Sequence, residues 1–181
     1  MRKLFCALTV TSALVFALAV HAAPPANFAG AWTLDKSKSQ GLNQRQQNAE
    51  SVSWVITQTE KDITIEEKMT GGNPPAGGPP GGGGGGQGRG MGMGGPRTFN
   101  LDGSETSTDT GRGKVVRKAT VSADGKTIEL SSKATFQGPE GEITTTSSDK
   151  LQLSADGKVL TVNRHSESPR GTQDSTLVFN K

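Results

Sequence analysis

Apolar and polar residues alternate with a period of two along most of the chain, and the alternating segments are bounded by Gly, Asp and Pro. This pattern is typical of strands that bury one face and expose the other. Helical periodicity is hard to find, and only residues 39–51 are expected to hold a short helix. The pattern predicts an all-β protein with strands at 28–35, 51–59, 62–69, 97–101, 104–109, 113–122, 127–137, 142–153, 158–167 and 172–180.

The turn sequence Ser-Ala-Asp-Gly-Lys occurs twice, at 122–126 and 154–158. In each copy Asp-Gly predicts a tight hairpin, because Gly125 and Gly157 can take the positive φ that other residues resist. In an up-and-down meander, every second connection lies at the same end of the sheet. We therefore expect one end with tight turns and an opposite end whose connections are longer or marked by Gly and Pro.

The expected inward positions change character between these two ends. Near the tight turns they are Val121, Ile128, Leu130, Leu151, Leu153, Leu160 and Val162. Toward the other end they become Arg117, Ser132, Ala134, Thr145, Ser147, Asp149 and Arg164. An interior that is apolar at one end and polar at the other fits an antiparallel up-and-down barrel of about 8–10 strands with a wet mouth. A frayed sheet end or the rim of a β-sandwich stays open as the alternative.

The first residues carry the features of a secretory signal peptide, with Arg2 and Lys3 ahead of an apolar run and small residues before a cut after Ala22. We expect residues 1–22 to be removed and the protein to be exported to the periplasm or the extracellular space. Residues 23–181 are then one domain without Cys, and no second apolar run predicts a membrane span. Removing two of the 20 basic residues leaves 18 against 17 acidic ones, a net charge of +1, which gives no argument for nucleic acid.

Residues 71–96 form an insert of 26 residues, of which 15 are Gly and 5 are Pro. Such a segment buries too little apolar surface to offset its ordering entropy, so we expect a disordered loop. Lengthening a connection from about 4 to 26 residues costs only roughly 1.7 kcal/mol. The insert is expected to act as a passive linker, and a lid or partner contact is the alternative.

The opening Phe28-x-Gly30-x-Trp32-x-Leu34-Asp35-x-x-Lys38-Ser39 resembles that of small secreted bacterial lipocalin-like proteins. The resemblance implies a barrel with a central cavity that binds small apolar or amphipathic ligands. It also implies a late-strand Arg over Trp32, for which Arg164 and Arg170 compete. The chain has no Tyr, so it lacks the Thr-Asp-Tyr signature of standard lipocalins.

No arrangement of residues in the sequence predicts an enzyme. His165, Ser166 and Glu167 are consecutive, and neighbours on a strand point to opposite faces, so they form no catalytic triad and His165 is expected to face solvent. Too few His and Cys remain for a zinc site, and we expect neither a metal nor a cofactor.

The candidate ligand-binding residues are Trp32, Trp54, Arg117, Asp149 and Arg164. We expect a small amphipathic ligand beside the two Trp rings, with the charged residues toward the mouth. Asp149 is expected to pair with Arg117 or Arg164, either as part of a head-group site or as an ion pair that satisfies charges at the rim. The alternative function is a structural or interaction protein of the cell envelope with a filled barrel, whose protein partner the sequence does not identify.

Overall fold

The computed structural model describes residues 24–71, 95–111, 113–138 and 141–181. The predicted signal peptide and all of the Gly-rich insert except Gly71, Gly95 and Pro96 therefore lie outside the described residues. All ten expected strands are present: β1 (Gly30–Leu34), β2 (Ser51–Gln58), β3 (Asp62–Thr70), β4 (Arg97–Asn100), β5 (Thr106–Asp109), β6 (Gly113–Val121), β7 (Thr127–Gly138), β8 (Gly141–Leu153), β9 (Val159–Ser168) and β10 (Gly171–Asn180).

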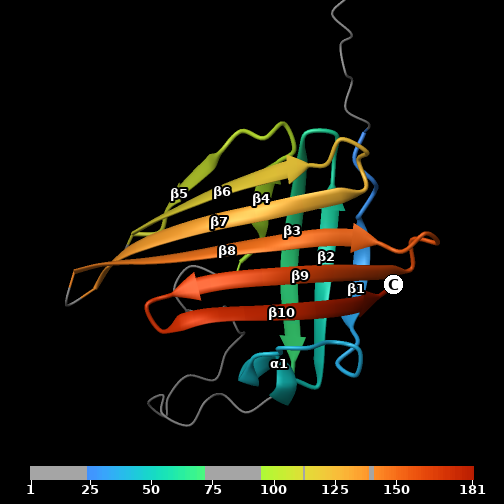
Figure 1. The fold of residues 1–181 in the computed structure, drawn as a ribbon, viewed down its shortest axis with the longest axis horizontal. Coiled ribbons are helices and arrows are strands. Elements are labelled where there is room, and N and C mark those ends of the chain that lie inside the picture. Colours follow the sequence, from blue (N-terminus) through green and yellow to red (C-terminus); the bar gives the residue numbers. More distant parts are fainter. Residues whose placement is uncertain (1–23, 72–94, 112, 139–140) are drawn as a thin grey trace, which may run out of the picture.

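The strands form one antiparallel up-and-down sheet that is nearly closed into a barrel. Its order is β4-β3-β2-β1-β10-β9-β8-β7-β6-β5, so β1 lies beside β10. Figure 1 shows β1, β2 and β3 running across β6 to β10. The described strands contain no ladder between β4 and either β5 or β6, although β4 and β6 lie close together, and we call this junction the seam.

The helix α1 (Gln44–Asn48) falls within the segment that the sequence allowed for it. It begins at a capping box, in which the Asn43 side chain accepts from the Gln46 backbone N–H at 2.9 Å and the Gln46 side chain accepts from the Asn43 backbone N–H at 3.1 Å. This pairing stabilises one short turn between β1 and β2. No helix among the described residues is long and apolar enough to cross a membrane.

The two Ser-Ala-Asp-Gly-Lys turns have the same structure, but each is a five-residue connection rather than the tightest hairpin. Asp124 accepts hydrogen bonds from the Ser122 hydroxyl at 2.6 Å and the Lys126 backbone N–H at 3.1 Å. Gly125 and Gly157 have φ of 69° and 67°, as expected. The prediction of a positive φ for both glycines is confirmed. The sequence interpretation missed the hydrogen bonds of the Ser and Asp side chains, which stabilise a connection of five residues.

The connections at the opposite end, which we call the open end, are less uniform than expected. The β7–β8 and β9–β10 connections span only residues 139–140 and 169–170, because these four strands continue to the tips of their hairpins. The hairpins extend beyond the region where β1 to β3 cross them (Figure 1). The open end is therefore a projecting sheet as well as a set of loops.

The core fills the tight-turn end. The Phe28 backbone N–H donates to the Gln58 side chain at 2.8 Å, and Ala26 N donates to Gly125 O at 2.7 Å, so the segment before β1 closes this end. Apolar side chains point inward as the alternation predicted. Those with almost no exposed surface include Phe28, Trp32, Trp54, Ile63, Ile65, Phe99, Ile128, Leu151, Leu160, Leu177 and Phe179.

Candidate functional site

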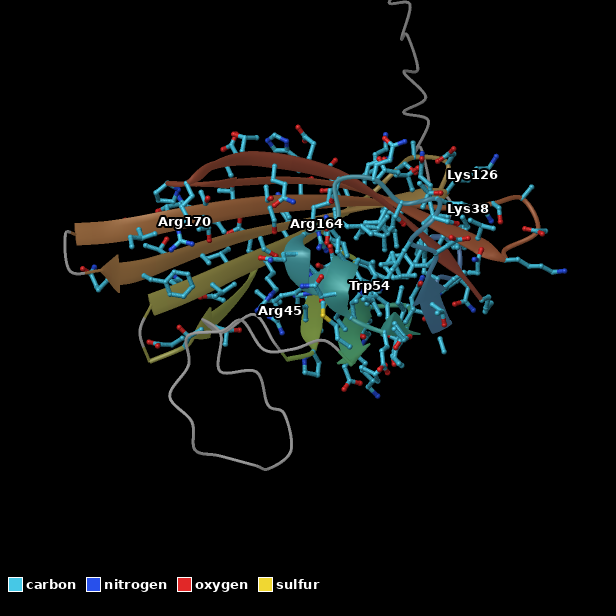
Figure 2. The ribbon with its side chains drawn as sticks, turned by 90° about the horizontal axis from the view of Figure 1, so that it is seen from below. Lys38, Arg45, Trp54, Lys126, Arg164 and Arg170 are labelled. Atoms are coloured by element: carbon cyan, nitrogen blue, oxygen red, sulfur yellow. The ribbon has the colours of Figure 1, made fainter. Side chains whose placement is uncertain are left out.

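Trp54 on β2 lies in the interior, where an arginine from β4 and an arginine from β9 approach its ring. The guanidinium carbons of Arg97 and Arg164 are 5.5 Å and 5.6 Å from the centre of its ring, within the range of a cation–π interaction. Its indole N–H donates to Glu67 at 2.8 Å. Figure 2 shows Arg164 beside Trp54 and Arg170 far from both. Trp54 thus joins the apolar core to the charged side chains of the open end.

Asp149 connects the two arginines. Its carboxylate accepts from Arg164 Nε at 2.6 Å and Nη2 at 2.8 Å, a bidentate pair between register partners on β8 and β9, and it lies 3.5 Å from Arg97 Nη1. Its side chain is only 3 % exposed. Burial alone would raise the pKa of Asp149, but the hydrogen bond and charge of Arg164, together with the charge of Arg97, hold that pKa below its ordinary value. Asp149 is therefore ionised and paired.

The same pairing acts on the arginines. Burial would lower the pKa of Arg164, but the hydrogen bond and charge of Asp149 raise it above its ordinary value. Burial lowers the pKa of Arg97, and the charge of Asp149 offsets only part of this effect. Arg164 is thus the stronger partner of Asp149, in agreement with the shorter distances.

Arg117 does not pair with Asp149, although the sequence made it a candidate. Its Nη1 donates weakly to Thr108 at 3.5 Å, while its Nε is buried without a hydrogen-bond partner among the described residues. Burial and the charge of Arg97 both lower the pKa of Arg117. We refer to Glu67, Arg97, Arg117, Asp149 and Arg164 as the charged cluster.

Arg97 and Glu67 are the members of this cluster that the sequence interpretation missed. A signal for both was present, because Arg97 has the same parity as the buried Phe99, and Glu67 has the same parity as the buried Ile63 and Ile65. Both residues lie at the polar ends of otherwise apolar faces. Extending the alternation by one step on β3 and β4 would have placed them inside.

Trp32 lies away from the charged cluster. Its indole N–H donates to Phe28 O at 2.9 Å, and the cation over its ring is Lys181, with Nζ 5.1 Å from the ring centre. The expectation that Arg164 or Arg170 covers Trp32 is therefore wrong, since Arg164 covers Trp54 and Arg170 is exposed between β9 and β10. Gly30 has a φ of 142°, and a Cβ there would approach Lys181 Cε at 2.9 Å, so glycine makes room for this lysine.

Neither tryptophan offers a surface to a ligand in this structure, because both side chains are fully buried. A cavity of about 20 Å³ lies instead at the seam, between Arg97 and Arg117, with Ser132, Thr145 and Ser147 in its lining. That volume holds about one water-sized particle. The interior beside the rings is thus filled by side chains, and the small cavity lies among polar groups.

The inner face continues past this cavity onto the projecting hairpins. Phe136 and Ile143 are register partners on β7 and β8, and Phe136 is also opposite Gly113 on β6. Ile143 is 39 % exposed, and Phe136 is half-buried. Exposed apolar surface therefore shares a face with Arg117.

His165 faces solvent, as expected. Its Nδ1 lies 2.6 Å from Asp174 on β10, and its Nε2 lies 3.4 Å from Glu167. The hydrogen bond to Asp174 is the main cause that raises the pKa of His165. Within the described ranges, no three His, Cys, Asp or Glu side chains come together as metal ligands.

Comparison with known proteins gives weak similarity to solved structures. No family model and no curated protein matches the chain. Among solved structures, the zebrafish ileal bile acid-binding protein complexed with cholic acid is similar, with a TM-score of 0.45 and 14 % identity over 85 % of this chain and 98 % of that one. The barrel described above rests on its own strand pairing, and this similarity adds no argument about function.

Proposed function

We propose that the protein is exported by residues 1–22 and binds a small anionic amphipathic molecule on the inner face of its open end. The observation that carries this proposal is the charge balance of the charged cluster, which has three arginines and two carboxylates. Asp149 neutralises Arg164, and the charge of Glu67 opposes the lowering of the Arg97 pKa that burial causes. Arg117 remains as the cation without a carboxylate among the described residues.

The apolar part of the ligand is proposed to lie along β6 and β7. Arg117 and Gly113 are four residues apart on β6, which corresponds to about 13 Å along a strand. Phe136 is opposite Gly113, so a molecule of that length can contact Arg117 at one end and the surface of Phe136 and Ile143 at the other. A negative head group and an apolar tail match the two parts of this face.

The residues proposed for contact therefore differ from those expected from the sequence. Arg117 keeps its role, while Trp32, Trp54, Asp149 and Arg164 stabilise the barrel behind the ligand. Binding at such a face needs no large internal cavity. It is also compatible with the fully buried tryptophan rings.

A second candidate is a structural or interaction protein of the cell envelope. The observation that favours it is the filled interior, with two fully buried tryptophans and a cavity of about 20 Å³. In this case the loops or strand edges contact another protein, and the inner face binds nothing small.

Isothermal titration with dodecanoate, dodecanol and dodecyltrimethylammonium separates the two candidates. We expect dodecanoate to bind best and Arg117→Gln to reduce its affinity about tenfold, the effect of one lost charge-assisted hydrogen bond. Arg170→Gln is the matched control, because it removes an exposed arginine from the β9–β10 tip. Absence of binding by all three compounds would favour the structural candidate.

The tail contact is tested separately with Ile143→Ser. We expect this variant to weaken the binding of dodecanoate and the binding of dodecanol to the same extent. Val116→Ser changes the outer face of β6 and should leave both affinities unchanged. Equal effects of the two serine variants would contradict the proposed position of the tail.

A further inference from the structure

Two buried polar atoms on β5 and β6, the strands on one side of the seam, have no hydrogen-bond partner among the described residues. They are Arg117 Nε and Thr106 Oγ1. Thr106 and Arg117 are register partners on β5 and β6, so their side chains lie on the same face. Buried polar groups are normally hydrogen-bonded, and each exception asks for an explanation.

The third contributor comes from the other side of the seam. Arg97 on β4 lines the same cavity of about 20 Å³ as Arg117. Burial is the main cause that lowers the pKa of Arg117, and the charge of Arg97 lowers it further. The cavity is therefore bordered by two cations, and Asp149, the carboxylate that contacts Arg97, is bound mainly to Arg164.

The remaining lining is suited to an anion. Ser132, Thr145 and Ser147 carry hydroxyl groups that can donate, and Val115 and Ala134 are buried apolar residues that limit access of water. A particle that only accepts hydrogen bonds would satisfy an N–H and several hydroxyls together. It would also balance the excess positive charge, which a water molecule cannot do.

We propose that the seam between β4 and β6 is a binding site for one small monovalent anion of the halide class, held between Arg97 and Arg117, with Thr106 beside Arg117 on β5. The size of the cavity limits the occupant to about one water-sized particle, which excludes a phosphate or sulfate group. The anion connects two strands that share no ladder in the described chain. A bound anion therefore stabilises the barrel at the junction between β4 and β6.

This site shares Arg117 with the proposed ligand surface but does not depend on it. Chloride is the probe, and the purified protein is compared in sodium chloride and sodium gluconate at equal ionic strength. We expect the melting temperature to be about 3 °C higher in about 0.15 M chloride, and the chloride-35 NMR line to broaden. Arg117→Gln should abolish both effects, and Arg170→Gln should preserve them.

Thr106→Val provides a second test with nearly unchanged volume, in case Arg117→Gln does not fold. It should reduce the chloride dependence while leaving the fold intact. Crystals grown in bromide should show an anomalous peak within hydrogen-bonding distance of Arg117 Nε. Equal stability in chloride and gluconate, or a chloride effect that persists in both seam variants, would overturn the proposal.

The dodecanoate titration is carried out in gluconate, so the two proposals fail separately. A chloride effect without dodecanoate binding would leave the anion site and remove the proposed function. Dodecanoate binding without a chloride effect would support the proposed function and remove the anion site.

Discussion

Asp149 and Leu151 lie two residues apart on the same face of β8, and both are buried, yet they are stabilised by different forces. Leu151 packs in the apolar core of the tight-turn end, where burial is favourable in any well-packed orientation. Asp149 depends on two arginines at defined positions. The difference teaches that a single strand can be stabilised by hydrophobic packing at one position and by specifically placed ion pairs two residues away.

The largest effect is expected from Asp149→Ala. The substitution leaves Arg164 and Arg97 buried without their carboxylate, so the free energy of unfolding should fall by about 3–5 kcal/mol. Urea denaturation measures the change. Asp174→Ala removes an exposed carboxylate from β10 and should lower the free energy of unfolding much less. Equal losses in the two variants would show that burial of the ion pair does not determine its contribution to stability.

A smaller loss, of about 2–4 kcal/mol, is expected for Leu151→Ala, because it opens a cavity in the filled core. Ser147→Ala, on the same strand and face but at the open end, should change stability by about 0.5 kcal/mol or less. Thermal unfolding of both variants measures the contrast. Similar losses at 151 and 147 would mean that the open end is packed as tightly as the core.

The smallest expected effect is the pH-dependent contribution of His165, which lies next to Arg164 on the outer face of β9. The pKa of His165 is raised in the folded state, chiefly by the hydrogen bond to Asp174, so protonated His165 contributes stability at low pH. This contribution is complete below the unfolded pKa of about 6.5 and is lost as the pH rises through the higher folded value. NMR titration should show the pKa of His165 moving down in Asp174→Asn and in high salt, whereas insensitivity to both would contradict the pairing.

Much of the barrel could be predicted because each strand carries its own alternation. The inward series from Val121 to Val162 and the positive φ of Gly125 and Gly157 follow from local chemistry alone. The cations over the two tryptophans could not be assigned, because they depend on which strands become neighbours. Lys181 reaches Trp32 only because β10 pairs with β1, and Arg97 reaches Asp149 only across the interior.

The ion pairing of the charged cluster was harder to predict for a similar reason. The sequence placed Arg117 and Asp149 on inward faces, but two candidate arginines could serve one carboxylate. Register decided between them, since Arg164 is directly opposite Asp149 on the adjacent strand and Arg117 is two strands away. The site therefore depends on pairings between strands that no single segment encodes.

The pairing of β1 with β10 has a consequence for how the fold is reached. The two strands are separated by almost the whole chain, so their ladder brings together residues with a very large sequence separation. Contacts of this kind form late and slow the folding of β-proteins. The first strand can pair only once the chain as far as Asn180 is present at the place of folding, so any shorter piece of the chain leaves this edge of the sheet open.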